Sequence, residues 1–276
     1  MVLLDGKSLR DEILLNVKNE ISNNNMDITL AIIMVGDNEA SKIYVRNKRI
    51  ACENVGINCI IHELDSSINE SSLINLINEL NDDSKVTGII LQSPIPDNLD
   101  FDKCCKMILP SKDVDGFTKD NIYDLYLNNE QLVPCTVKGI IKLLDYYNIS
   151  LEGKNVTIVG RGNIVGKPLM LALLNRNATV TIAHSKTKNL ADATICADIV
   201  ISAVGKPNLV TADMIKDDAV VIDVGISRVD GKVVGDVSFE TVKDKCSYIT
   251  PVPGGVGPMT VAMIMENLLI AYRKGE

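Results

Sequence analysis

Two side chains on one helical face form the first candidate site for proton transfer. The segment SKIYVRNKRIACENVG, residues 41–56, has the apolar spacing of a helix and places Tyr44 four residues before Lys48, so both side chains share a face. That face continues with three small or apolar residues: Ala51, Cys52 and Val55. A lysine in such a stripe is expected to be partly desolvated, which makes it fit for proton transfer, with Tyr44 as hydrogen-bond donor to it or to a substrate. A surface pair whose lysine extends into water would show the same spacing.

Two further polar residues stand where strands and loops meet. Gln92 closes the apolar run VTGIILQ, residues 86–92, at the end of a strand where α/β sheets bind ligands, and its amide both donates and accepts hydrogen bonds. Asp115 precedes Gly116 in a loop rich in Asp, Pro and Gly, and a carboxylate there can accept two parallel bonds from an amino-pyrimidinone edge. Either residue alone is also a common loop cap.

A glycine-rich turn indicates an anion site. The segment VTIVGRGNIVGKPLM, residues 156–170, runs from an apolar strand through Gly160, Arg161 and Gly162 into a helical pattern. Free backbone N–H groups and the positive end of the helix dipole favour a phosphate at such a turn. The spacing G-x-G-x-x-x-G is one residue longer than the dinucleotide fingerprint, so an ordinary tight turn remains an alternative.

The end of the next strand indicates which dinucleotide the turn would bind. In NAD-binding domains an acid about 20 residues beyond the glycines binds the ribose 2′-hydroxyl, but here TVTIA, residues 179–183, is followed by His184, Ser185, Lys186 and Thr187. Hydroxyls and cations, with Arg161 at the neighbouring turn, suit a 2′-phosphate. We therefore expect NADP rather than NAD, although solvated surface charges would give the same residues.

The elements around these residues predict an α/β protein of two domains. In the first half, a helix over 9–21, a helix after a capping box at Ser67 and Glu70, and strands over 29–36, 58–64 and 86–92 predict a parallel sheet with helices on both faces. The segment 91–121 lacks periodicity and is expected to be loop. In the second half, a connecting helix over 136–148 precedes strands near 156–159, 179–183, 199–204 and 219–224, which predict a Rossmann-like domain. We place the domains at 1–120 and 121–276, with an apolar final helix over 258–274 packing back between them.

Composition excludes several classes of protein. The 276 residues are 46% hydrophobic and 23% charged, which excludes disorder, and the chain has neither a bilayer-length apolar run nor a cleavable apolar start, so we expect a cytoplasmic protein that does not bind membranes. A net charge of −8, three Phe and no Trp argue against nucleic-acid binding. The seven cysteines form no C-x-x-C pair, so we expect reduced thiols and no metal.

A series of motifs resembles the bifunctional methylenetetrahydrofolate dehydrogenase/cyclohydrolase family. The motifs are YVRNKRIACENVGI, GIILQSPIP, SKDVDGF, PCTVKGIIKLL, GRGNIVGKPL, ATVTIAHSKT, ADIVISAVGKP, VIDVGI and TPVPGGVGPMTVAMIMEN. The resemblance implies an N-terminal folate-site domain, an NADP-binding Rossmann domain, a cleft between them and a homodimer. It also implies oxidation of 5,10-methylene-tetrahydrofolate to the methenyl compound and hydrolysis to 10-formyl-tetrahydrofolate, in one-carbon metabolism and purine biosynthesis.

The resemblance also assigns roles to single residues. Lys48 resembles the family's catalytic lysine, and Tyr44 and Gln92 resemble its orienting partners. Asp115 resembles the acid that binds the pterin. The segment PVPGGVGP resembles a wall of the folate site, with three candidate contacts: Pro253, Gly257 and Thr260. Five positions match cofactor-binding residues: Gly160, Arg161, Gly162, Ser185 and Ile226.

Four positions depart from the family pattern. Gly162 stands where a serine is usual, Val137 where a proline is usual, Ser93 where a leucine usually follows Gln92, and Ile50 where a second lysine is common. None removes a proposed catalytic group, so the departures bear first on cofactor affinity and then on the shape of the folate site.

Two other functions share these sequence features. One is another two-domain dehydrogenase of the same architecture, such as a shikimate-type enzyme, because a fold hosts many activities. The other is a non-catalytic NADP-binding protein, which would bind the cofactor without turnover. The complete set Tyr44, Lys48, Gln92 and Asp115 argues against the second.

Overall fold

The structure is a computed structural model that describes residues 1–275. Contacts between Cα atoms divide the chain into two compact units. The first unit contains Asp11–Cys135 with Val261–Glu276, and the second contains Met1–Arg10 with Thr136–Thr260. The main division between the units falls between residues 135 and 136. The sequence analysis placed the domain boundary between residues 120 and 121.

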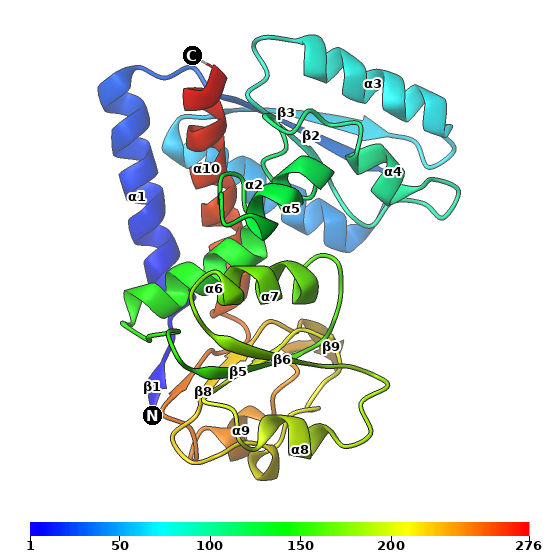
Figure 1. Ribbon diagram of the computed structural model, residues 1–276. Helices are drawn as coiled ribbons and strands as arrows, with labels where there is room; N and C mark the ends of the chain where they lie inside the picture. Colours follow the sequence, from blue (N-terminus) through cyan, green and yellow to red (C-terminus); the bar gives the residue numbers. More distant parts are fainter. Residues whose placement is uncertain (276) are drawn as a thin grey trace. The chain divides into compact units, whose positions relative to one another are not determined.

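The first unit is built on a three-stranded parallel sheet in the order β3-β2-β4. The strands are β2 (Thr29–Val35), β3 (Asn58–Leu64) and β4 (Gly88–Leu91). Every residue of the central strand β2 is buried, whereas β3, at the edge, alternates between exposed and half-buried residues. The helices α2 (Glu39–Val55) and α3 (Glu70–Asp82) lie on opposite faces of this sheet (Figure 1). The predicted parallel sheet with helices on both faces is confirmed.

Apolar side chains from α3 and β2 form the core on one face of this sheet. Leu73 and Ile77 of α3 pack with Ala31 and Ile33 of β2 in a single buried cluster. On β4, a Cβ atom built on Gly88 would lie 2.5 Å from a methyl carbon of Val114 and 2.7 Å from one of Leu268. The end of helix α10 (Val256–Gly275) therefore packs so tightly on β4 that only glycine fits there.

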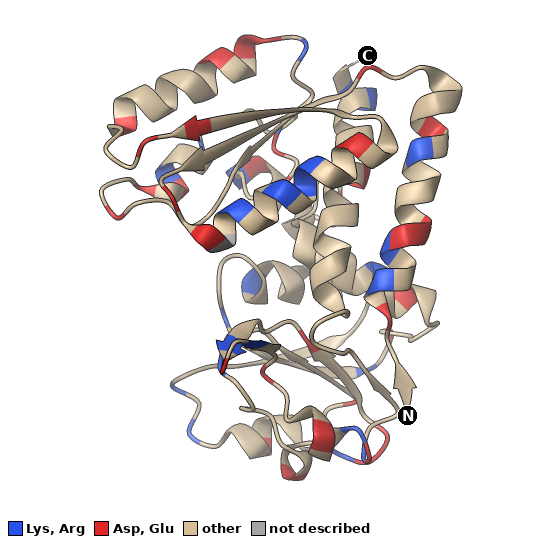
Figure 2. Cartoon of the chain, turned by 180° about the vertical axis from the view of Figure 1, so that it is seen from behind, with Lys and Arg blue, Asp and Glu red and all other residues tan. Residues whose placement is uncertain are grey.

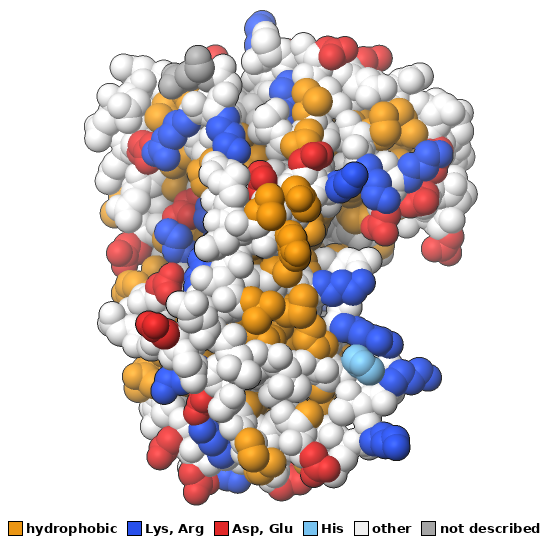
Figure 3. Space-filling view, in the orientation of Figure 1, with side chains coloured by type: hydrophobic (Ala, Val, Ile, Leu, Met, Phe, Trp, Pro, Cys, Tyr) orange, Lys and Arg blue, Asp and Glu red, His pale blue; other side chains and the backbone are white. Residues whose placement is uncertain are grey.

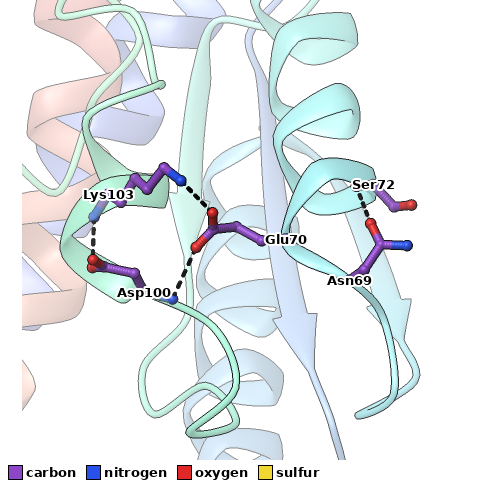
Figure 4. Close-up of polar contacts among 5 residues, drawn as sticks. All are labelled: Asn69, Glu70, Ser72, Asp100 and Lys103. Carbon is purple, nitrogen blue, oxygen red and sulfur yellow. Dashed lines mark hydrogen bonds and ion pairs between the residues drawn. The ribbon is translucent and has the colours of Figure 1, made fainter.

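The start of α3 differs from the predicted capping box. The N-cap is Asn69, whose side chain accepts a hydrogen bond from Ser72 N at 2.8 Å (Figure 4). Glu70 instead forms an ion pair with Lys103 and accepts from Asp100 N at 3.4 Å, while Ser67 donates to Asp65 at 2.6 Å. The capping-box prediction is wrong for two reasons. Asn is as good an N-cap residue as Ser, and the Glu70 side chain pairs with Lys103 instead of with the helix N-terminus.

The segment predicted as loop contains short helices. Helix α4 (Phe101–Cys105) begins after Asp100, whose side chain accepts from Lys103 N at 2.9 Å. Helix α5 (Lys119–Tyr126) begins inside the segment and extends beyond it. Both helices are shorter than the window over which helical periodicity can be detected, so the loop prediction is only partly right.

The second unit contains a six-stranded parallel sheet in the order β1-β11-β8-β7-β5-β6. Its four predicted strands are present: β5 (Asn155–Val159), β6 (Thr179–Ala183), β7 (Ile199–Ser202) and β8 (Val220–Asp223). Four strands were not predicted: β1 (Val2–Leu3), β11 (Tyr248–Ile249) and the antiparallel hairpin β9 (Ser227–Val229) with β10 (Lys232–Val234). Strands of two or three residues are too short to show alternation.

Helices cover both faces of the second sheet. They are α6 (Cys135–Tyr146), α7 (Gly166–Leu174), α8 (Leu190–Thr194), the 3₁₀ turn η1 (Ala212–Met214) and α9 (Phe239–Val242). Figure 1 shows α7 on one side of β5 and β6, and α8 and α9 on the other. The predicted Rossmann-like arrangement is confirmed. Helices α1 (Gly6–Asn24) and α10 each begin in the second unit and end in the first.

Among the residues described, the cysteines form no disulfide bonds, and most are buried. Five are buried, Cys59 is half-buried and Cys196 is exposed. Within residues 1–275 no three His, Cys, Asp or Glu side chains are arranged to hold a metal ion. No helix of the described chain combines the length and apolar character needed to cross a membrane.

Candidate functional site

A buried lysine and a fixed amide form the centre of the first unit's candidate site. Lys48 is only 7% exposed, and its Nζ donates to Gln92 Oε1 at 3.0 Å. Gln92 follows β4 directly, and hydrogen bonds fix both its backbone and its side-chain amide. Its backbone N donates to Ile33 O at 2.8 Å and its Nε2 donates to Ser93 O at 2.7 Å. The strand end thereby fixes the oxygen that positions the lysine.

Lys48 lies on the buried stripe of α2, which otherwise carries exposed charges. Figure 2 shows charged positions along the length of this helix, but Ser41, Val45 and Cys52 share the buried side with Lys48. Lys48 is therefore buried on this side of the helix, and its role in proton transfer stays a prediction. Tyr44, one turn earlier on the helix, is 44% exposed, so of the two residues only Lys48 is buried.

The loop that carries Asp115 is organised by a neighbouring acid. Asp113 is buried and accepts from Gly116 N at 2.9 Å, Thr118 N at 2.6 Å and Asn121 Nδ2 at 3.0 Å. A Cβ atom on Gly116 would lie 2.6 Å from Leu132 O. The segment DVDGF thus contains one acid, Asp113, that closes the loop and a second, Asp115, that is half-buried.

Asp115 shares an electrostatic environment with Lys48. Burial raises the pKa of Asp115 above its usual range, and the nearby charge of Asp113 acts in the same direction. The Lys48 charge and a hydrogen bond from the Cys135 thiol oppose that shift. The structure therefore places Lys48, Gln92 and Asp115 in one unit, and their roles at a folate site stay predictions.

A buried amide on α10 supports the same loop. Asn267 is fully buried, and its Nδ2 donates to Val114 O at 2.9 Å and to Val133 O at 3.0 Å. The sequence analysis singled out neither Asn267 nor Asp113. Asp113 gave a signal, because it precedes Gly116 by three residues, as a turn-closing acid does. Asn267 lies within an apolar helix, where an uncompensated amide would be costly.

The glycine-rich turn is shaped first by the protein's own backbone. Gly160 has φ +123°, and a Cβ on it would lie 2.5 Å from Ala203 O. A Cβ on Gly166, where α7 begins, would lie 2.3 Å from Gly160 O. No atom lies within 4 Å of the corresponding position on Gly162. The first and third glycines are thus required for close packing, and the second leaves open space beside exposed Arg161.

The strand register places Ser185 beside this turn. Val159 pairs with Ala183 on the adjacent strand, and Gly160 N donates to Ala183 O at 2.8 Å. The turn after β6 closes on itself, because Thr187 Oγ1 accepts from His184 N at 2.8 Å and His184 Nδ1 accepts from Lys186 N at 3.1 Å. Ser185 and Lys186 remain exposed.

Basic side chains gather around this end of the sheet. Figure 3 shows Lys and Arg side chains on the face of the second unit where the loop after β6 lies. The exposed cations of these loops are Arg161, Lys186, Lys188 and Lys206. In a protein of net charge −8, this local positive charge fits a phosphate group.

The remaining predicted residues all belong to the second unit. Ile226 follows β8 and is 49% exposed. Gly257 approaches it, since a Cβ on Gly257 would lie 3.8 Å from Ile226 Cδ1. Thr260 Oγ1 lies 3.4 Å from Thr136 Oγ1, and Pro253 is exposed. Folate contacts by Pro253, Gly257 and Thr260 stay predictions.

Two family models match the chain in series. The model described as "Tetrahydrofolate dehydrogenase/cyclohydrolase, catalytic domain" matches residues 4–115. The model described as "Tetrahydrofolate dehydrogenase/cyclohydrolase, NAD(P)-binding domain" matches residues 134–276. Together the two models span most of the sequence. The first covers the segment that contains Lys48, Gln92 and Asp115, and the second covers the segment that contains the glycine-rich turn.

Full-length relatives give the same result. The bifunctional protein FolD of Thermodesulfovibrio yellowstonii is 50% identical over 275 residues, covering 98% of this chain and 96% of that protein. A crystal structure of the bifunctional FolD dehydrogenase/cyclohydrolase from Campylobacter jejuni superposes with a TM-score of 0.97 at 47% identity, covering 99% of each chain. The Trypanosoma brucei enzyme, complexed with NADP and an inhibitor, has a TM-score of 0.94 at 34% identity over 99% of this chain and 98% of that one.

A more distant group of enzymes shares only the fold. Shikimate dehydrogenase from Aquifex aeolicus has a TM-score of 0.55 at 15% identity, over 89% of this chain and 97% of that one. Identity at that level carries no inference about activity. The chain belongs to the tetrahydrofolate dehydrogenase/cyclohydrolase family of bifunctional enzymes.

Proposed function

We propose that this protein oxidises 5,10-methylene-tetrahydrofolate with NADP and hydrolyses the methenyl product to 10-formyl-tetrahydrofolate. The observation that carries the proposal is the buried Lys48, which donates to Gln92 at 3.0 Å and whose charge opposes the upward shift in the pKa of Asp115. A buried lysine bonded to an amide and close enough to act on a buried acid is a costly arrangement, and such arrangements concentrate at functional sites. Family membership supports the same two reactions.

In the first reaction the protein's contribution is placement. Asp115 accepts two N–H bonds from the amino-pyrimidinone edge and so fixes the pterin. NADP supplies the hydride acceptor, and the folate nitrogens stabilise the methenyl cation that remains. Lys48 and Gln92 orient the one-carbon bridge, and no proton has to move during the transfer.

The second reaction requires protons to move. Water adds to the methenyl carbon and loses a proton, which gives a neutral carbinol. The bond from that carbon to N5 then breaks as N5 gains a proton and the carbinol hydroxyl loses its proton, leaving the formyl group on N10. Lys48 carries protons between the water and the folate nitrogen. Gln92 Oε1 holds the lysine nitrogen in place throughout. The net reaction consumes one water and releases one proton.

The direct test of the proposal is absorbance after mixing. Native protein with 5,10-methylene-tetrahydrofolate and NADP should produce NADPH and then 10-formyl-tetrahydrofolate. Turnover of shikimate, or NADP binding without turnover of either substrate, would favour one of the two alternative functions instead.

We propose that Arg161 and Ser185 select NADP over NAD by binding the 2′-phosphate. The strand register and the open space at Gly162 support this role. Charge-assisted contacts contribute about 1.5–3 kcal/mol each, which is roughly 10- to 100-fold in affinity. Arg161→Ala should therefore raise the KM for NADP by about that factor and leave the KM for folate unchanged.

A cation at the other end of strand β5 from Arg161 provides the matched control. Lys154 is exposed and precedes β5, so Lys154→Ala should leave the KM for NADP at the native value. Equal use of NAD and NADP by the native enzyme would contradict the assignment of Arg161 and Ser185.

We also propose a homodimer that forms through the edge strand β3. This strand pairs only with β2 among the described strands, and Ile60 on it is 43% exposed. An exposed, apolar edge strand invites pairing with another chain. A dimer in the cytoplasm, supplying formyl groups for purine biosynthesis, agrees with the family resemblance.

The dimer is tested by sedimentation at several protein concentrations. Ile60→Asp should shift the protein toward monomer, because the variant places a charge at the pairing edge. Ser71→Asp, an exposed position on α3, should remain as associated as the native protein. A native protein that sediments as monomer at all concentrations would disprove the dimer.

A further inference from the structure

A second pair of buried acids lies at the cofactor end of the second unit's sheet. Asp236 is fully buried and accepts three hydrogen bonds from one short segment. Its Oδ2 accepts from Ser202 Oγ at 2.9 Å and Val204 N at 2.7 Å, and its Oδ1 accepts from Lys206 N at 2.7 Å. These donors span the end of β7 and the loop that follows it. One carboxylate therefore determines the path of the 203–206 loop.

Asp223, at the end of β8, holds Asp236 in its turn. Its Oδ1 accepts from Gly225 N at 3.0 Å and Asp236 N at 2.9 Å, and its Oδ2 accepts from Val237 N at 2.9 Å. Burial raises the pKa of Asp223 to about 6, the backbone hydrogen bonds from Val237, Asp236 and Gly225 oppose that shift, and the Asp236 charge adds to it. Two buried carboxylates side by side destabilise a fold. The arrangement therefore has a cost that a purely structural turn would not require.

Glycines allow the two acids to approach the loops this closely. A Cβ on Gly225 would lie 2.1 Å from Asp236 Oδ1, and a Cβ on Gly235 would lie 1.9 Å from Asp223 Oδ2. The segments around Gly225 and Gly235 thus lie directly against the carboxylates. Asp236 contacts the backbone just before Ile226 as well as the loop after β7.

These segments form the ligand-facing edge of the sheet. The carboxyl ends of parallel strands are where α/β proteins bind ligands, and Ala203 O is the atom against which Gly160 of the glycine-rich turn packs. Val204 and Ile226 present 47% and 49% of their apolar side chains to solvent there. Such exposed apolar side chains suit the flat face of a nucleotide ring.

We propose that Asp236 is a positioning residue for the cofactor, which together with Asp223 holds Val204 and Ile226 against the NADP ring system and supports the turn at Gly160. This inference rests on the proposed dehydrogenase function. Asp236 is fully buried, so it acts on the cofactor site through the backbone that it holds.

The test compares a cofactor-dependent and a cofactor-independent activity in one variant. Asp236→Asn keeps the side chain's size but replaces one acceptor oxygen by a donor, so at least one of the three hydrogen bonds is lost. We expect the KM and the Kd for NADP to rise about tenfold or more. Hydrolysis of methenyl-tetrahydrofolate, supplied directly without NADP, should proceed at the native rate.

Two further variants keep the test decisive. Ser202→Ala removes a single donor to Asp236 and should raise the Kd for NADP in the same direction by a smaller factor. Asp217→Asn, an exposed acid before β8, is the matched control and should behave as native. If Asp236→Asn does not fold, the Kd of Ser202→Ala for NADP decides the question.

The outcomes separate this inference from the proposed function. Native Kd for NADP in Ser202→Ala and Asp236→Asn, or a parallel fall in both activities, would overturn the positioning role while leaving the enzyme's function intact. Failure of the native protein to oxidise methylene-tetrahydrofolate would instead overturn the proposed function. NADP binding measured by calorimetry on each variant does not depend on turnover.

Discussion

Replacing Lys48 by methionine is expected to abolish hydrolysis of methenyl-tetrahydrofolate while a measurable part of the dehydrogenase activity survives. Proton transfer by a positioned side chain contributes about 10²- to 10⁴-fold, and only the hydrolytic reaction requires it. Hydride transfer depends on Lys48 for orientation alone. With methylene-tetrahydrofolate and NADP, the methenyl compound should therefore accumulate at its own absorbance band.

The choice of methionine separates chemistry from folding. Methionine keeps an unbranched stem and a high helix propensity, so α2 and its buried stripe should persist. The substitution leaves Gln92 Oε1 without the lysine donor, which costs about 1–3 kcal/mol of stability. Circular dichroism and thermal unfolding therefore accompany the activity measurements.

Lys42 on the same helix provides the control. It is partly exposed and pairs with Asp37 and Glu39, so Lys42→Met removes a cation from α2 without touching the buried stripe. This variant should retain both activities. A folded Lys48→Met protein that hydrolyses the methenyl compound at the native rate would remove Lys48 from the mechanism and leave Tyr44 or a bound water as proton carrier.

Periodicity predicted the sheets because their strands are long or fully buried. After Thr29, the run LAIIMVG has none of the alternating polar positions of a half-buried strand, and β2 is buried along its whole length. The strand NCIIHEL was predicted at its observed bounds. By contrast, β1 and β11 contain two residues each, and β1 pairs with a strand at the other end of the chain, since Val2 lies opposite Tyr248.

Predictions of single interactions failed where a distant partner competes. Ser67 and Glu70 have the spacing of a capping box, but Lys103 lies 33 residues further along the chain and pairs with the glutamate. No local pattern contains that information. The same holds for Asn267, whose hydrogen bonds reach Val114 and Val133 across the first unit.

At the candidate site, too, local sequence predicted some features, and others depend on the fold. The helical spacing of Tyr44 and Lys48 predicted a shared face, and the burial of Lys48 is consistent with the small residues around it. Its bond to Gln92 depends on where β4 ends relative to α2, which only the fold determines. The glycine pattern predicted that a phosphate approaches the backbone of the turn. At Gly160, however, the atom that lies closest is Ala203 O of the protein itself.

Substitution of Asp115 is expected to weaken folate binding and so depress both activities together. Asp115→Asn replaces a charged acceptor of two N–H bonds by an amide, and charge-assisted bonds contribute about 1.5–3 kcal/mol each. Folate affinity measured by calorimetry should fall roughly 10- to 100-fold, and NADP affinity should stay native. Asp120→Asn, an exposed acid at the start of α5, is the control and should bind folate as the native protein does.

The pH dependence of folate binding gives a second measure of the same residue. Burial raises the pKa of Asp115 above its usual value of 3.8, so the carboxylate becomes protonated at a higher pH than an exposed Asp. Folate affinity in the native protein should therefore fall on acidification before exposed acids titrate, and this dependence should disappear in Asp115→Asn.

The same raised pKa affects the stability of the fold in the opposite direction. Because the pKa of Asp115 is raised in the folded state, ionisation of its carboxyl group lowers the stability of the fold as the pH rises. The variant should thus be about as stable as the native protein at neutral pH, and a loss of folate binding cannot be attributed to unfolding. Native folate affinity and an unchanged pH profile in Asp115→Asn would reduce Asp115 to a loop residue.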